Sequence, residues 1–526
     1  MNPPARPFLR RVVRQVSTSD DGRIVFRQWL TIMPFLALLA AGYLLYLGVI
    51  GAPLPVESEE TACAIGAGYC LVMSGLTLFF GRIGLFSFPG GFLGVSGLYL
   101  VGLLLAFALQ GDVAFAVWHV VDMEAILCGI PLVMLAFTGF FIGCIWAVTR
   151  RLAESENPPP AAARFARRYA LVAGGALFGL AVALILFETL RGAGLMYAME
   201  GGYFYLAEMQ YGGGGLGLAW AALVWFLPWG VIILTAAAER KRDLWWVIPV
   251  LLIANAILVI SGDRGGLFVL DLVAVMRVSL LGFRLRWWQS LGLAALIIVT
   301  IPTLMVLRQL PSRNWTADLV LEALTSKSDG ALGTDPISAT LIEGGLSYKV
   351  LMGTLAFVPA REDYHYGADY IRSLAVAVPF FSRIMPDLVQ RNDLWVKDYV
   401  DHQLSIAGIG FLQLAEAYVQ FGAWGVLGFY LLMGFGVPYL WRCCKERPLS
   451  SCQLAYALIL ADTVLLWIRN EFDVVVKPVV WCFILLIILP KILGRFSMAR
   501  RPEGTLPAAR VGRPRISAKQ LATVDS

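Results

Sequence analysis

Apolar stretches of about twenty residues recur along the whole of this chain, and each is long enough to cross a lipid bilayer as a helix. Of the 526 residues, 59% are hydrophobic and only 15% are charged, which is more apolar surface than one water-soluble core can bury. Backbone amides inside hydrocarbon need partners within their own segment, so the stretches predict helices rather than open strands. We therefore expect an all-α polytopic integral membrane protein with about twelve transmembrane helices. The stretches lie near residues 30–50, 61–80, 91–110, 126–148, 169–188, 215–236, 246–261, 266–281, 289–307, 413–440, 452–468 and 475–494.

Positive charges are distributed unevenly between these stretches. Basic clusters such as 150–151, 240–242 and 442–447 fall in alternate loops. Because cytoplasmic loops near helix ends collect Lys and Arg, we expect both termini in the cytoplasm, as a basic segment 1–28 and a basic, disordered tail 495–526. The net charge of +6 then reflects membrane topology, and we expect no nucleic-acid partner.

The regular spacing of apolar stretches breaks between residues 308 and 412. A loop of that length without structure of its own is unusual, so 308–412 is predicted to be a large, partly helical periplasmic loop domain. Its apolar pieces, 350–358 and 371–381, are too short to span and predict helices that lie on the membrane interface or dip into it. The domain separates a first block of spans, 29–307, from a second block, 413–494.

A charged pair, Asp263 and Arg264, stands among glycines at the end of one apolar stretch, in the run SGDRGG. Glycine lets the backbone approach a ligand, and arginine binds phosphate through two parallel hydrogen bonds. The pair is therefore a candidate for holding the diphosphate of a lipid carrier; the alternative is a pair that caps a tight turn. Further arginines in the large loop domain, which would bind diphosphate or make ordinary headgroup contacts, are Arg308, Arg383 and Arg391.

A histidine with acidic neighbours precedes the second block of spans. His402 follows two nearby aspartates, and such a histidine close to a membrane face can act as general base for a sugar hydroxyl. The alternative is a solvated histidine in a charged linker. Charged groups within spans are costly and mark function or a buried partner. On that basis Glu416 and Arg469 are candidates for the site, whereas Asp462 is expected to be paired structurally.

The eight cysteines predict neither a disulfide framework nor a zinc site. By this placement all of them lie in spans or at cytoplasmic edges, and none lies in the large loop domain.

The run 408–425, GIGFLQLAEAYVQFGAWG, leads from glycines into a helical pattern that contains Ala-Glu-Ala-Tyr, followed by an aromatic-Gly pair and a further Gly. It resembles a pattern of the bacterial O-antigen polymerase (Wzy, oligosaccharide repeat-unit polymerase) family. Three other pieces are similar in the same order, namely 261–265, 378–386 and 468–472. The resemblance is best over 261–494, and the N-terminal half matches only in hydropathy. Residues 387–388, Asp-Leu, depart from the lysine and proline that often follow in the family.

The resemblance implies a metal-independent glycosyltransferase of the bacterial inner membrane, GT-C-like in fold and without a cofactor. Such an enzyme moves a growing glycan from one undecaprenyl-diphosphate carrier to a sugar hydroxyl on another, and so builds O-antigen, capsule or exopolysaccharide at the periplasmic face. His402 or Glu416 would then be the base, and the arginines would stabilise the leaving diphosphate. Tyr418, in the same run as Glu416, joins the substrate-binding candidates. The resemblance also implies a chain-length regulator and a flippase as partners.

Three other functions fit the same layout. An O-antigen ligase passes a finished glycan to a lipid A core and resembles the polymerase in organisation. A polysaccharide or lipid transporter would hold its polar residues in a central cavity between symmetric halves, whereas here we expect them at the outer face. A purely structural scaffold is disfavoured by the arginine, tyrosine and histidine content of the large loop domain.

The predicted topology can be tested with reporter fusions. Fusions at Ser328, in the large loop domain, and at Glu446, in a basic loop, should report opposite sides of the membrane. Reporters active on the same side at both positions would contradict this topology.

Overall fold

The computed structural model describes residues 20–110, 123–152, 158–191, 222–261, 263–283, 289, 336–378 and 411–499. Within these ranges the regular structure is helical, without a strand, and eight segments are long and apolar enough to cross a membrane. The all-α polytopic fold is thereby confirmed. The helices in these segments are α2 (Asp20–Ile50), α3 (Glu59–Phe80), α4 (Phe88–Ser96) with α5 (Gly102–Gln110), α7 (Met123–Thr149), α8 (Pro160–Leu190), α12 (Leu244–Ser261), α21 (Gln413–Glu446), and α23 (Phe472–Phe483) with α24 (Leu489–Ala499).

Three further predicted spans are present as shorter helices. They are α11 (Leu227–Ala237), which a π-helical turn precedes, α13 (Arg264–Leu280) and α22 (Ser451–Trp467). The stretch near 289–307 lies almost entirely outside the described residues. The count of about twelve spans therefore stays a prediction.

The centre of the bundle is the contact between α7 and α21. A Cβ added at Gly143 would lie 2.2 Å from the backbone oxygen of Leu431, and one at Gly434 would lie 2.2 Å from that of Phe140. The two helix backbones are therefore in direct contact, because small residues let membrane helices approach closely.

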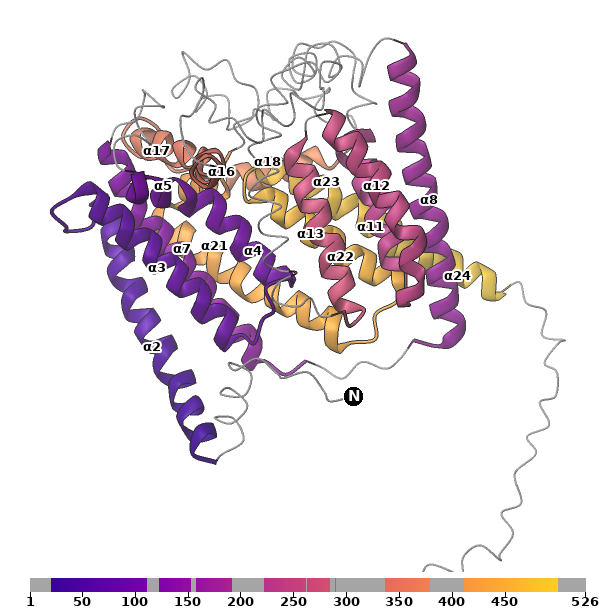
Figure 1. Cartoon of the computed structure of the whole chain (residues 1–526), viewed down its shortest axis with the longest axis horizontal. Coiled ribbons are helices and arrows are strands. Elements are labelled where there is room, and N and C mark those ends of the chain that lie inside the picture. Colours follow the sequence, from indigo (N-terminus) through magenta and orange to yellow (C-terminus); the bar gives the residue numbers. More distant parts are fainter. Residues whose placement is uncertain are drawn as a thin grey trace, which may run out of the picture.

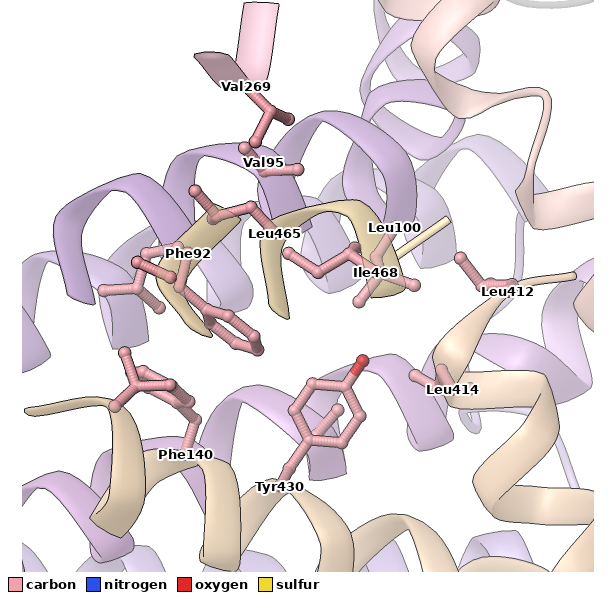
Figure 2. Packing of buried hydrophobic residues seen from close by; sticks show 14 of the residues in the cluster. Phe92, Val95, Leu100, Phe140, Val269, Leu412, Leu414, Tyr430, Leu465 and Ile468 are labelled. Atoms are coloured by element: carbon pink, nitrogen blue, oxygen red, sulfur yellow. The ribbon is translucent and has the colours of Figure 1, made fainter. Parts of the chain in front are cut away.

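Aromatic rings fill the space beside this contact. The ring of Phe92 in α4 stacks on that of Phe140 at a centroid distance of 4.8 Å, and its edge meets Tyr430 at 6.5 Å (Figure 2). α4, α7 and α21 thus share one packed core, which fixes the position of α21 against the first block of spans.

One end of the bundle is held together by arginines at helix C-termini. Arg442 donates to three carbonyls at and just beyond the end of α7, those of Ala147 (2.7 Å), Val148 (3.2 Å) and Arg150 (2.9 Å). Arg167 donates to Ala237 at the end of α11 at 3.2 Å, and Arg277 donates to another α11 carbonyl at 3.3 Å. The unpaired carbonyls of a helix C-terminus carry partial negative charge, so these cations stabilise the end at which α7, α11 and α21 finish.

Three short helices of the 308–412 region lie together at the opposite end (Figure 1). They are α16 (Pro336–Gly345), α17 (Tyr348–Phe357) and α18 (Ala368–Val376). α17 is largely buried, and the Tyr348 hydroxyl donates to the Ile126 carbonyl in α7 at 3.0 Å. The apolar piece at 350–358 therefore packs onto the spans, and its place at the membrane interface stays a prediction.

The run that carries the family resemblance contains a break in α21. Phe421 (φ −147°, ψ 19°) and Gly422 (φ 63°, ψ −151°) have non-helical backbone angles and divide α21 into 413–420, which we call the motif helix, and 423–446. A Cβ added at Gly425 would lie 2.1 Å from the oxygen of Ala417. In an unbroken helix these two residues would be about 12 Å apart along the axis, so the motif helix folds back against the rest of α21.

The break makes Gly422 sensitive to substitution. Its backbone angles are accessible essentially to glycine alone, and an added Cβ would lie 3.1 Å from the Tyr364 ring. We expect Gly422→Ala to destabilise the protein by about 1–3 kcal/mol, measured as a lower thermal midpoint in detergent.

Gly428, in the same helix, is the matched control because an added Cβ there meets nothing within 4 Å. Gly428→Ala should leave the midpoint unchanged or raise it. Equal midpoints for the two variants would show that α21 is not broken at residue 422.

Candidate functional site

The motif helix is anchored at its start to the turn between α22 and α23. The backbone amide of Gln413 donates to the Ile468 carbonyl at 3.2 Å. One turn further on, Glu416 is 1% exposed, and both of its carboxylate oxygens accept hydrogen bonds: Oε2 from Trp467 Nε1 at 2.9 Å and Oε1 from the Phe472 amide at 3.1 Å. A buried carboxylate needs such donors, so Glu416 ties α21 to α22 and α23.

The end of the motif helix is capped by a turn from the 308–412 region. The amides of His365 and Tyr366 donate to the carbonyls of Val419 (3.0 Å) and Gln420 (2.9 Å). The Gly367 amide donates to Oε1 of the Gln420 side chain at 2.9 Å. Carbonyls at a helix C-terminus have no partner within the helix, and here the turn 365–367 supplies their donors.

A charged network surrounds this cap. The imidazole of His365 contacts Asp369 through Nδ1 and Glu362 through Nε2, the latter at 2.9 Å. Asp369 also accepts hydrogen bonds from the Gln420 side chain and, at 3.3 Å, from Arg372. The bonds to Asp369 and Glu362 raise the pKa of His365 above its ordinary value of 6.5, against the opposing effect of partial burial.

Tyr370 links the two anchors of the motif helix. Its ring meets Phe472 edge to face at 5.2 Å, beside the amide that Glu416 binds. Burial and the nearby carboxylates of Glu416 and Asp369 raise the pKa of the Tyr370 hydroxyl. The phenol therefore stays protonated and can donate a hydrogen bond.

Buried polar groups without a described partner occur at the start of the motif helix and on Tyr430 of the same α21. Neither the Oε1 nor the Nε2 of Gln413, which is fully buried, has a hydrogen-bond partner among the described residues, and the same holds for the Tyr430 hydroxyl. Figure 2 shows this hydroxyl directed toward Leu414, at the start of the motif helix, and toward Ile468. Buried donors and acceptors of this kind are normally satisfied by water or by a ligand hydroxyl.

The structure places the charged pair of the SGDRGG run at the start of α13. The Asp263 carboxylate caps the helix and accepts a hydrogen bond from the Gly266 amide at 2.9 Å. Asp263 therefore has the turn-capping position that is expected from the sequence as the alternative to diphosphate binding. Asp462 of α22 is buried, and its structural pairing stays a prediction. The side chain of Arg264 lies outside the description, so its diphosphate role stays a prediction.

Two other candidates lie near the motif helix. Tyr418 is buried in it, with its ring edge to face against Tyr364 at 5.9 Å. Arg469 follows Ile468 in the α22–α23 turn, and its guanidinium lies 5.8 Å from the ring of Tyr99. The structure therefore brings Glu416, Tyr418 and Arg469 to one end of the bundle. The remaining candidates, which lie outside the described residues, are Arg308, Arg383, Arg391 and His402.

Sequence reasoning missed four residues that organise this end. His365 and Asp369 are separated by four positions, a spacing at which helical side chains meet, and this was the available local signal. The hydrogen bond between Asp369 and Gln420 and that between Trp467 and Glu416 each join residues 51 positions apart. Nothing in the local sequence specifies such pairs. Among the described residues no group of three or more His, Cys, Asp or Glu side chains could hold a metal ion.

A family model described as O-antigen polysaccharide polymerase Wzy matches residues 32–500, which is most of the chain. No curated protein and no solved structure matches.

The role of Trp467 as a donor to Glu416 can be tested by Trp467→Phe. This change removes one hydrogen bond from a buried carboxylate and should lower stability by about 1–3 kcal/mol, seen as a lower thermal midpoint in detergent. Trp481→Phe is the control, because Trp481 is 39% exposed and its indole makes no hydrogen bond to a described residue. A similar midpoint for both variants would remove the anchoring role from Trp467.

Proposed function

Because the chain belongs to the O-antigen polysaccharide polymerase Wzy family, we propose that it joins lipid-linked oligosaccharide repeat units into a polysaccharide at the periplasmic face of the bacterial inner membrane. The donor and acceptor would be glycans on undecaprenyl-diphosphate carriers. O-antigen, capsule and exopolysaccharide are all products of such a reaction. A chain-length regulator and a flippase would be its protein partners.

The observation that carries this proposal is the position of the motif helix. The run that resembles the family pattern folds into a short helix that is bonded at both ends, with Glu416 and Tyr418 buried in it. It lies at the end of the bundle opposite the arginine-capped helix ends, together with α16–α18 (Figure 1). Since Lys and Arg collect on the cytoplasmic side, this arrangement supports a site at the periplasmic face.

The proposed reaction is a displacement at a sugar carbon. A hydroxyl oxygen of the acceptor glycan attacks the anomeric carbon of the donor glycan, and a base takes the hydroxyl proton. The bond from that carbon to the diphosphate oxygen breaks, and the carrier diphosphate leaves with the electron pair. A diphosphate is a good leaving group when its charge is stabilised, so the reaction needs cations near it.

Arginines are the residues proposed to hold the two carrier diphosphates. The guanidinium group binds phosphate through two parallel hydrogen bonds and stays charged at every physiological pH. Arg469 lies in the turn that anchors the motif helix, and Arg264 begins α13 after the Asp263 cap. The further arginines proposed for diphosphate binding are Arg308, Arg383 and Arg391.

His402 and Glu416 are the two candidates for the base. Both oxygens of Glu416 already accept a hydrogen bond from within the protein. This geometry favours an anchoring role for Glu416, which leaves His402 as the proposed base. Tyr418, beside Glu416, is proposed to contact the glycan.

Glycan length in cells tests the proposal. Deletion of the gene should leave single repeat units on the carrier or on the lipid core, and restored wild-type protein should return a ladder of long chains. Arg264→Ala should fail to restore the ladder although the protein reaches the membrane, because a diphosphate contact is lost. Long chains that stay on the carrier after deletion would instead indicate a ligase.

Arg168→Ala is the matched control for the loss of a positive charge. Arg168 is exposed near the start of α8, at the arginine-capped end. This variant should restore a normal ladder. A normal ladder with Arg264→Ala would remove Arg264 from the site.

A further inference from the structure

The network around His365 joins two segments that are distant in the sequence. We call it the clasp and define it as Glu362, His365, Asp369, Arg372 and Gln420. The first four belong to the segment 362–372, and Gln420 ends the motif helix. The clasp therefore connects the 308–412 region to the break in α21.

The two contacts of the His365 ring require a particular protonation state. Each ring nitrogen faces a carboxylate oxygen, Nδ1 that of Asp369 and Nε2 that of Glu362. A carboxylate is only an acceptor, so both nitrogens must donate, and only the imidazolium has two N–H groups. In neutral imidazole one nitrogen would turn a lone pair toward a carboxylate.

The clasp is continuous with the backbone cap of the motif helix. The amide of His365 itself donates to Val419, and Asp369 accepts from the side chain of Gln420. Gly367 has a left-handed backbone conformation (φ +86°) that places the turn 365–367 against the break in α21. A Cβ at this position would lie 3.2 Å from the Phe421 ring. A change in the His365 ring therefore acts on the same turn that satisfies the end of the motif helix.

We propose that His365 is a positioning residue that holds the segment 362–372 on the motif helix while its ring is protonated and releases it at alkaline pH. The clasp would thereby make glycan polymerisation sensitive to the pH outside the cytoplasm, a consequence that rests on the proposed function. His365 acts through the backbone cap, and no contact with substrate is assigned to it.

The charges around His365 agree with docking that weakens as the ring loses its proton. On its own segment the ring faces Glu362 and Asp369, and Arg372 pairs with the far oxygen of Asp369. From the neighbouring elements, the buried carboxyl group of Glu416 in α21 lies near Asp369, and Asp473 of α23 lies near Glu416; neither is a cation that could replace the imidazolium. Loss of the imidazolium charge therefore leaves carboxylates facing one another.

The pH dependence follows from linkage between protonation and docking. The pKa of His365 is raised above 6.5 in the docked state, so the imidazolium stabilises docking fully below that value. This stabilisation is lost as the pH rises through the docked-state pKa. Between the two pKa values the ratio of docked to released clasp should fall by up to about tenfold per pH unit.

Amide hydrogen exchange of the full-length protein in lipid nanodiscs tests the clasp without reference to activity. The amides of His365, Tyr366 and Gly367 donate across the break, so their protection reports docking. After correction for intrinsic exchange, protection in the wild type should fall as the pH rises above 6.5, through the raised docked-state pKa of His365. Protection that is independent of pH would overturn the proposal.

Three variants identify the titrating group. His365→Gln should give low protection at every pH, and Glu362→Gln should move the midpoint to lower pH because one carboxylate partner is lost. Asp363→Asn is the matched control. It neutralises an exposed carboxylate that lies between Glu362 and His365 in the sequence, and it should leave the midpoint unchanged. A wild-type midpoint in Glu362→Gln, or wild-type pH dependence in His365→Gln, would contradict the assignment to His365.

Glycan lengthening by the same nanodiscs separates the two proposals. If lengthening falls over the pH range in which protection falls, and Glu362→Gln shifts both together, the clasp controls the polymerase. If protection behaves as expected but no preparation lengthens glycan at any pH, the proposed function is wrong and the clasp stands. If lengthening occurs and is independent of pH, the regulatory consequence is overturned.

Discussion

A backbone carbonyl near the membrane must find a donor, and the break in α21 creates carbonyls that have none within their own helix. The chain meets this requirement with the backbone amides of His365 and Tyr366, which donate to the last two carbonyls of the motif helix, and the Gly367 amide donates to the Gln420 side chain beside them. The start of the same helix is held by the α22–α23 turn through Glu416. A segment of only eight residues is thus bonded at both ends to parts of the chain that lie about fifty positions away on either side.

The two ends of the bundle satisfy their helix termini in different ways. At one end arginine side chains cap the carbonyls of α7 and α11, and two of these arginines also pair with the carboxylates of Asp243 and Glu446. At the other end carboxylates, an imidazole, a guanidinium and a carboxamide share hydrogen bonds between the segment 362–372 and the motif helix. A dense polar network is costly to bury and tends to mark a functional region of a membrane protein. The network around the motif helix supports a polymerase site at that end.

The spans were predictable from the sequence because hydropathy over about twenty residues is a local property. That Glu416 has a specific buried environment was also predictable, since a charge in an apolar stretch needs a partner or a function; its role in a site stays a prediction. The break at Phe421 was not, because the apolar run continues through it and a glycine inside a helical pattern is common. The partners of Glu416 and of Gln420 were out of reach for another reason: each lies 51 positions away and is fixed by packing of the whole bundle. His365 and Asp369 had the right spacing, but only the long-range bond to Gln420 gives that spacing a role.

The proposed function requires that this chain itself lengthens glycan on a lipid carrier. This can be measured as the product length when the purified protein in nanodiscs is incubated only with undecaprenyl-diphosphate-linked repeat units. A polymerase should give a ladder of multiple repeat lengths, with one carrier diphosphate released for each bond formed. Repeat units that remain single in the presence of folded protein would contradict the proposed function.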